Sequence, residues 1–530
     1  MSFKALAPLA IAASLVLPAS ALAAECPVAP DPSALPDAAA LKRMTTFEAQ
    51  LGSRPTGSRA QARFVASLRM AMRAVPGVKL SEIPFRVNRW TARRSTLHLI
   101  VGGRRVRVPI AGPVPYSQRT PKRGVAGPLA FIDDAEPITS ANAGGRVVVR
   151  PAPAGSVANA LFFLPVVSYA SYDPEHTIDP AGVFRGDFLN YNARVKDLRD
   201  AKAAGAKAIL FVKDRPRRQL IGHYEPYEGT SWGVPGLFLG ADEGKRLTDA
   251  LAVGGAPRAR VTLRVRRRKV RTPTLLATLP GQSPQKLVIE SHTDGTNAAE
   301  DNGPVAMVAM ARYFANLPLD CRPRTLQFAF STAHFYQRVT SPTLRHGGSG
   351  ELARRLDAEY DKGLVSAVVV LEHLGAIEYD GVPRKGGRPG VRLEPTGLRA
   401  IQFIAITPSP ALVGAVDGVV RAYDMQRTLM LQGADAPGST VPSHCSFGGE
   451  GTPYNQALLP TVAAIAAPQS LYDPPFGLEG IDFEVMREET LGFTELINRM
   501  QVMPQASVAG TVPLDRMRRA QGAEGCPSEN

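Results

Sequence analysis

Three apolar, strand-like segments in the C-terminal half of the chain each end on side chains that can bind a metal ion. In order, they are residues 286–290 leading to His292, residues 325–330 leading to His334, and residues 365–371 leading to Glu372. Binding sites of open α/β sheets form at the carboxyl ends of the strands. Because imidazole and carboxylate groups are ligands of zinc, the sequence predicts a zinc site at this edge of a sheet.

Two acidic residues after the first segment extend this candidate site. Asp294 lies two residues from His292, and a metal-bound imidazole needs an acceptor for its second nitrogen, so we expect Asp294 to orient His292. Asp301 precedes an Asn-Gly-Pro turn at the start of a predicted helix, where a rigid turn can present a carboxylate to an ion. His373 directly follows Glu372 and would point away from it along an extended strand, so we interpret His373 as structural.

The elements that would position these side chains alternate between helix and strand. Apolar residues recur at helical spacing over residues 38–51 and 60–75, on either side of a loop at 52–58. From residue 273 onward, strands alternate with helices. The remaining elements expected there are a helix at 303–316, strands at 403–406, 429–432 and 461–465, and a final helix at 483–500. This order predicts an α/β fold with a mainly parallel sheet covered by helices.

A separate unit is predicted between residues 105 and 268. Its expected elements are a strand at 146–150, a helix at 195–204, strands at 208–212 and 234–239, a helix at 242–251 and a strand at 260–265. The domain boundaries we predict are therefore 34–104 with 269–505 for a discontinuous α/β domain, 105–268 for the inserted unit, and 506–530 for a C-terminal tail.

The N-terminus has the pattern of a secretory signal peptide. Lys4 precedes an apolar stretch at residues 5–17, and Ala-Leu-Ala at 21–23 is a small-residue cleavage site. Later apolar runs are too short to span a bilayer. We therefore predict cleavage of residues 1–23 and export, which makes the mature protein secreted or periplasmic without a membrane span.

The cysteines and the net charge fit an exported protein. Four cysteines, Cys26, Cys321, Cys445 and Cys526, lie far apart, and in an oxidising compartment we expect one or two disulfides, with all pairings open. The formal net charge is +15, and the densest basic run is 264–271. This run lacks aromatic residues that could stack on bases. We interpret it as an Arg-rich soluble surface and expect no nucleic-acid partner; binding to an anionic wall polymer or to nucleic acid is the alternative.

Residues 34–100 and 273–500 resemble the co-catalytic zinc aminopeptidases, which include bacterial leucyl aminopeptidases and glutamate carboxypeptidase II. The matching features are the 54–58 loop, His292, Asp294, Asp301 with Asn302, and Glu372. The inserted unit resembles a protease-associated domain over residues 196–213 and 234–244. The resemblance implies a mainly parallel mixed sheet between helices, interrupted by an inserted α+β domain that carries no chemistry of its own.

The resemblance also implies roles for individual residues. His292 and Glu372 would bind one zinc ion, Asp301 would bridge two ions, and Asp294 would orient His292. A cis peptide bond between Asp301 and Asn302 is implied as well.

The chain departs from the family at the second ion. A Glu-Glu pair follows the family's strand at the position of residues 325–330, whereas this chain has His334 with Phe335, or Ala333 with His334 if the register shifts. The family's final histidine ligand is absent from 468–474. One ligand set is complete and the other is broken, so we expect about one zinc ion.

Two functions remain open. The first is an exported zinc metallopeptidase-like hydrolase, of the aminopeptidase type, that acts on peptides or small amides, with His334 as a neutral general base beside the ion. The second is a binding protein that kept the fold and lost catalysis, as the transferrin receptor ectodomain has within this family.

Overall fold

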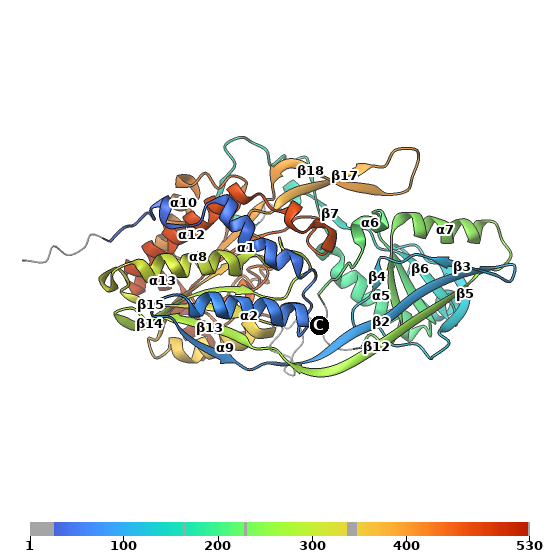
Figure 1. The fold of residues 1–530 in the computed structure, drawn as a ribbon, viewed down its shortest axis with the longest axis horizontal. Coiled ribbons are helices and arrows are strands. Elements are labelled where there is room, and N and C mark those ends of the chain that lie inside the picture. Colours follow the sequence, from blue (N-terminus) through green and yellow to red (C-terminus); the bar gives the residue numbers. More distant parts are fainter. Residues whose placement is uncertain (1–25, 163–165, 227–230, 337–346, 528–530) are drawn as a thin grey trace, which may run out of the picture.

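The computed structural model describes residues 26–162, 166–226, 231–336 and 347–527. The expected signal peptide lies outside the described residues. Two large sheets dominate the structure and lie at opposite ends of the long axis (Figure 1). No helix in the described part of the chain combines the length and apolarity needed to cross a bilayer.

The larger sheet has nine strands, and its centre is parallel. In spatial order the strands are β1 (Lys79–Ile83), β13 (Thr274–Leu279), β15 (Arg324–Ser331), β14 (Ser283–His292), β16 (Val365–Leu371), β21 (Thr461–Ala466), β19 (Gln402–Ile406), β20 (Thr428–Leu431) and β8 (Val167–Tyr172). β14 pairs in parallel with both β15 and β16, and β16 pairs in parallel with β21. The carboxyl ends of these strands therefore lie at one edge.

Helices cover both faces of this sheet. One face packs against α1 (Ala38–Gln50), α2 (Arg59–Arg73), α8 (Gly303–Asn316), α10 (Pro410–Ala422) and α12 (Phe483–Val502), and the other against α9 (Gly347–Tyr360) and α11 (Gly451–Gln456). Along β14, Leu287 and Ile289 enter the first core and Val288 the second, because successive side chains of a strand point to opposite faces. The predicted fold class is confirmed.

The smaller sheet has eight strands. They are β3 (Arg104–Val108), β2 (Arg86–Val101), β12 (Arg258–Arg271), β5 (Val125–Phe131), β6 (Val147–Pro151), β10 (Ala208–Val212), β11 (Gly236–Leu239) and β4 (Gly112–Pro113). Helices α5 (Tyr191–Ala203) and α7 (Ala241–Ala252) accompany this sheet. β2 and β12 pair antiparallel from Arg86 with Arg271 to Ile100 with Arg258, and this long ribbon runs between the two ends of the molecule (Figure 1).

Part of the predicted inserted unit does not join the smaller sheet. β8 pairs with β20 at the edge of the nine-stranded sheet, and β7 (Gly155–Ala158) pairs with β9 (Val183–Gly186) in a separate two-stranded sheet. β2 lies wholly before residue 105, yet it belongs to the eight-stranded sheet. The predicted range 105–268 therefore does not coincide with one sheet.

A buried ion network joins the two ends of the molecule. Arg215, which follows β10, binds the carboxylates of Asp187 and Asp473, and all three side chains are buried. Asp473 belongs to the loop after β21 of the larger sheet, and it also lies 2.6 Å from Nδ1 of His223. The network therefore connects the smaller sheet to the loop at 468–474.

Two disulfides join residues that lie far apart in the sequence. Cys26 pairs with Cys321, and Cys445 pairs with Cys526. The expectation of one or two disulfides is therefore confirmed, and the structure selects one of the pairings that the sequence left open.

Replacing Arg215 by methionine should destabilise the protein by about 3–5 kcal/mol, because the carboxylates of Asp187 and Asp473 would lose a shared buried partner. Arg218→Met is the matched control, since Arg218 is exposed. Urea unfolding of the mature protein, followed by tryptophan fluorescence, measures both. Equal midpoints for the two variants would contradict the importance of this network.

Candidate metal centre

The three strand ends predicted to form a site do meet. His292 is the last residue of β14, His334 follows β15 in a turn, and Glu372 directly follows β16. The rings of His292 and His334 stack with centroids 4.0 Å apart and an angle of 10° between their planes. Nε2 of His292 lies 3.4 Å from Oε2 of Glu372. The prediction that strand ends deliver these groups to one place is supported by this geometry.

Glu300, which the sequence did not single out, takes the place expected for Asp301. Oε1 of Glu300 lies 3.4 Å from Nε2 of His334 and 3.9 Å from Nε2 of His292. Asp301 instead accepts hydrogen bonds from the buried guanidinium of Arg54 on both carboxylate oxygens. The only cis peptide bond among the described residues is Val441–Pro442, so the implied cis bond after Asp301 is wrong.

Asp294 orients His292 through its backbone carbonyl, not through its carboxylate as the sequence predicted. Nδ1 of His292 lies 3.1 Å from the backbone carbonyl oxygen of Asp294. The carboxylate of Asp294 accepts hydrogen bonds from Thr56, from Gln61, and from the backbone N–H groups of residues 334 and 335. The carboxylate therefore fixes the turn that carries His334, while the carbonyl orients His292.

His373 turns back toward the site. The backbone of His373 is left-handed, with φ of 60°, which breaks the alternation expected along an extended strand. Its Nδ1 bonds to the carbonyl of Ala466, and His373 forms a group with His292 and Glu300 in which one ligand atom from each residue lies within 4.8 Å of the others. The argument that His373 points away from the site therefore fails at this turn.

Glu450 is a further acidic residue that the sequence did not indicate. Its Oε1 lies 2.6 Å from Nδ1 of His334, and its backbone N–H donates to Oε1 of Glu372 at 2.7 Å. A Cβ on the neighbouring Gly449 would collide with the carboxylate of Glu372, so only glycine permits this close approach. The loop thus orients both His334 and Glu372.

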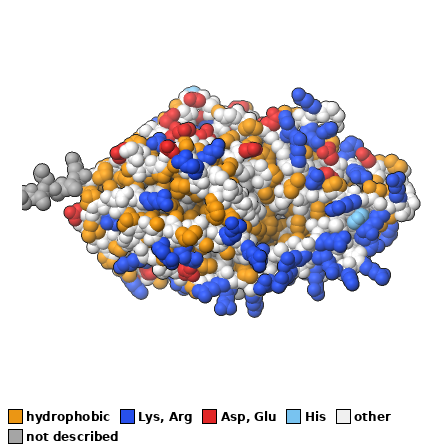
Figure 2. All heavy atoms as spheres, in the orientation of Figure 1, with side chains coloured by type: hydrophobic (Ala, Val, Ile, Leu, Met, Phe, Trp, Pro, Cys, Tyr) orange, Lys and Arg blue, Asp and Glu red, His pale blue; other side chains and the backbone are white. Residues whose placement is uncertain are grey.

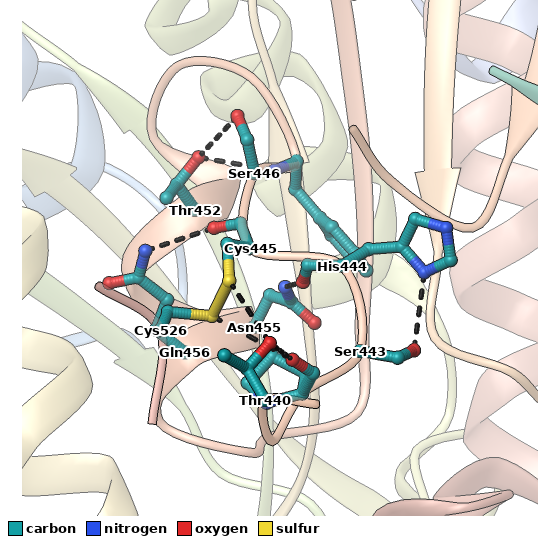
Figure 3. Close-up of a disulfide and its surroundings, with 11 residues drawn as sticks. Thr440, Ser443, His444, Cys445, Ser446, Thr452, Asn455, Gln456 and Cys526 are labelled. Carbon is teal, nitrogen blue, oxygen red and sulfur yellow. Dashed lines mark hydrogen bonds between the residues drawn. A yellow bond between two sulfur atoms is a disulfide. The ribbon is translucent and has the colours of Figure 1, made fainter. Parts of the chain in front are cut away.

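A disulfide anchors the loop that carries Glu450. Figure 3 shows Cys445 bonded to Cys526, with Asn455 donating to the carbonyl of His444 at 2.7 Å and Gln456 to the carbonyl of Cys445 at 2.9 Å. The His444 ring lies on the side away from the disulfide, beside Ser443 (Figure 3), and lines a separate cavity of about 230 Å³. The structure therefore does not bring His444 to the metal-binding group.

The unpaired atoms at the strand ends fit a cation. Nε2 of His292, Nε2 of His373, Oε1 of Glu300 and Oε2 of Glu372 are buried and have no hydrogen-bond partner among the described residues. Ligands of a tetrahedral zinc ion lie about 3.3 Å apart, since each bond is about 2.0 Å long. The 3.4 Å between His292 and Glu372 matches this spacing. His292 belongs to two candidate ligand groups, one with Glu300 and His373 and the other with His334 and Glu372, and this shared ligand favours a single ion.

The carboxylates also set the charge of the imidazoles. Burial alone would lower the pKa of His292, but the carboxylates of Glu300 and Glu372 outweigh it and raise this pKa to about 9. Burial also opposes protonation of His334, yet the nearby carboxylates of Glu300 and Glu450 hold its pKa well above the usual value. Without a bound cation, the neighbouring carboxylates therefore favour the protonated form of His334. A cation bound among these carboxylates would lower the pKa of His334 and favour its neutral form.

A third group of possible ligands belongs to the buried ion network. Asp187, His223 and Asp473 have ligand atoms within 4.8 Å of one another. However, Asp187 and Asp473 bind Arg215, and both ring nitrogens of His223 already face carboxylates, of Glu225 at 2.7 Å and of Asp473 at 2.6 Å. These atoms are used within the protein, so we assign no ion to this group.

The fold is that of the zinc aminopeptidases. The structure is similar to an aminopeptidase from Aneurinibacillus sp. strain AM-1 (TM-score 0.53, 15% identity, covering 87% of this chain and 93% of that one). It is also similar to BSAP, a zinc aminopeptidase from Bacillus subtilis (0.57, 14%, 89% and 98%), and to a peptidase M28 precursor from Shewanella amazonensis SB2B (0.57, 14%, 88% and 96%). No protein-family model and no curated protein sequence matches the chain. The resemblance found in the sequence is thus confirmed at the level of the fold.

Replacing both Cys445 and Cys526 by serine should lower stability by about 2–4 kcal/mol, because the unfolded chain loses a long closed loop. Hydrogen exchange should increase at residues 440–456 while α8 stays protected. The Cys26→Ser/Cys321→Ser variant is the control, because its disulfide lies outside this loop. Unchanged exchange at 440–456 would show that hydrogen bonds alone hold the loop.

Proposed function

We propose that the protein is an exported, zinc-dependent hydrolase of the aminopeptidase type that acts on peptides or small amides with one zinc ion. The observation that carries this proposal is a set of four buried ligand atoms without hydrogen-bond partners, from His292, Glu300, Glu372 and His373, at and beside the strand ends. Their arrangement on an aminopeptidase fold supports a hydrolytic rather than a purely structural site.

The ligand set differs from the one expected from the sequence. His292 would hold the ion together with Glu300, in the place expected for Asp301, and His373, since the ligand atoms of these three lie within 4.8 Å of one another. Glu372, whose Oε2 lies 3.4 Å from Nε2 of His292, would complete the set. Asp301 would act indirectly, since its ion pair with Arg54 fixes the turn that presents Glu300.

A zinc ion bound there would act as a Lewis acid on the carbonyl of the scissile amide. His334 would carry the proton: its Nε2 would accept it from the attacking water and return it to the leaving amine. Glu450 accepts at Nδ1 of His334 and thereby fixes the tautomer and orientation of the ring. This pair would replace the family's Glu-Glu pair.

Export is supported by the cysteines. Both disulfides join residues far apart in the chain, and such structural disulfides belong to oxidising compartments. Together with the predicted signal peptide, they favour a secreted or periplasmic location.

A binding protein without catalysis is the second candidate. The observation that favours it is the loss of the acidic pair after β15, where His334 and Phe335 stand instead. Fold alone does not decide between an enzyme and a binder. If a broad amide and ester panel, tested with added zinc, gives no turnover, this candidate replaces the first.

The metal assignment predicts about one zinc ion per chain, because the candidate ligands share His292. Glu300→Gln and Glu372→Ala should each lose zinc in elemental analysis. Asp301→Asn should keep zinc even if its melting temperature falls, because its amide oxygen can still accept a hydrogen bond from Arg54 and hold the turn. Zinc loss in Asp301→Asn, with zinc kept in Glu300→Gln, would restore the sequence-based assignment. Two tightly held ions per chain would contradict the single site.

The proton-transfer assignment predicts that His334→Ala lowers hydrolysis of short peptides by roughly 10²- to 10⁴-fold while zinc stays bound. In the wild type, the rate should rise with pH as His334 loses its proton. Glu450→Gln removes a carboxylate that raises the His334 pKa, so this rise should move to lower pH. His444→Ala is the control, since His444 lies in a separate cavity. A His334→Ala rate equal to wild type would reject His334 as the base.

A further inference from the structure

A strip of exposed cations follows the long ribbon that runs between the two ends of the molecule. β12 contributes Arg264, Arg266, Arg267, Arg268, Lys269 and Arg271, all exposed. Figure 2 shows Lys and Arg side chains gathered along the lower edge of the molecule, where Figure 1 places β2 and β12. We call the exposed basic residues of β2, β12 and the 118–123 loop the basic ribbon.

Like charges face each other across this ribbon. Arg264 pairs in register with Arg94, and Arg271 pairs with Arg86. Among the described residues, none of these four side chains forms an ion pair with an acidic group. Like charges directly opposite on paired strands are destabilising. An external anion would relieve this repulsion.

The ribbon also borders a hollow that is lined by cations. An irregularity in the register between Arg264 and Val265 leaves Arg93 without a partner across the ribbon, as in a β-bulge. Arg93 and Arg264, with Arg119 and Lys122 of the neighbouring loop, line a cavity of about 730 Å³ that no carboxylate lines.

The loop beside the hollow is fixed to β12. The backbone N–H of Thr120 donates to the carbonyl of Leu263 at 2.9 Å, and the N–H of Leu263 donates to Oγ1 of Thr120 at 3.0 Å. Arg119 and Lys122 are therefore held next to Arg264 by backbone geometry. A preformed cationic hollow of this kind loses little entropy when it binds an anion.

The side chains exposed on the ribbon indicate which class of anionic ligand it could bind. Trp90, the tryptophan of β2, is only 6% exposed, so it cannot stack on a base. The exposed large hydrophobic residue of the ribbon is Val101, at the end of β2, and none lies beside the hollow, which disfavours insertion into a membrane. Phosphate or sulfate groups repeated along a flexible chain would match both the strip and the hollow.

We propose that the basic ribbon binds a linear polyanion, a chain of closely spaced phosphates without stacking bases, one segment of which enters the hollow between β12 and the 118–123 loop. This binding is independent of the metal centre and of the proposed reaction. It would attach the protein to an anionic polymer outside the cytoplasm.

The test uses the mature, full-length protein and long-chain inorganic polyphosphate without divalent cations. The ribbon variant reverses four charges, with Arg93→Glu, Arg119→Glu, Lys122→Glu and Arg264→Glu. The control variant makes the same change in net charge beside the larger sheet, with Arg43→Glu, Arg73→Glu, Arg312→Glu and Lys362→Glu. All eight residues are exposed, so both variants should fold.

The ribbon variant should bind polyphosphate at least about tenfold more weakly than wild type, and the slope of log K against log salt should fall by about three. The control should stay close to wild type. An equal loss in both variants would show that net charge alone drives binding and would overturn the proposal. Tighter binding to phosphatidylglycerol vesicles, or to single-stranded DNA in a base-dependent way, would also overturn it.

A neutral variant with glutamine at the same four ribbon positions provides a second measurement. It should lose polyphosphate binding without a lower melting temperature, because it removes the repulsion between Arg264 and Arg94. Retained binding in this variant would exclude these side chains as the site.

Discussion

The buried ion pair between Arg54 and Asp301 is the constraint on which the geometry of the strand-end site depends. Although burial opposes its charge, Asp301 has a lowered pKa because the guanidinium of Arg54 binds both of its oxygens. Breaking such a pair would leave a charge buried without a partner. With Asp301 committed to Arg54, the adjacent Glu300 is the residue that reaches His292 and His334. A single pairing thus decides which of two neighbouring acids faces the imidazoles.

The loop that bears Arg54 also organises the rest of the site. Thr56 donates to the carboxylate of Asp294, and that carboxylate accepts from the backbone of the turn that carries His334. Ser58 then caps α2 by accepting from the backbone of Gln61. An N-terminal loop therefore fixes side chains that lie more than two hundred positions further along the chain.

The loop at 468–474 links the buried ion network to the strand-end site. It presents Asp473 to Arg215 and His223, which lie between β10 and β11 of the smaller sheet. Tyr472 of the same loop packs against Phe335, with ring centroids 6.1 Å apart, directly beside His334. The loop thus connects the buried ion network around Arg215 with the candidate metal site around His334. The segment between β10 and β11 thereby supports, through this loop, the turn that carries His334, and we assign it no ligand of the candidate site.

The sequence by itself predicted the fold class, the helices and strands that carry the candidate site, and the convergence of His292, His334 and Glu372, because strand ends and hydrophobic periodicity are local properties of the chain. Only the tertiary structure decided between Glu300 and Asp301, since that choice depends on Arg54, which is distant in sequence. The position of His373 depended on a left-handed turn after β16. Glu450 lies in a glycine-rich loop with no periodic signal, and a disulfide and packing against Glu372 bring it to His334.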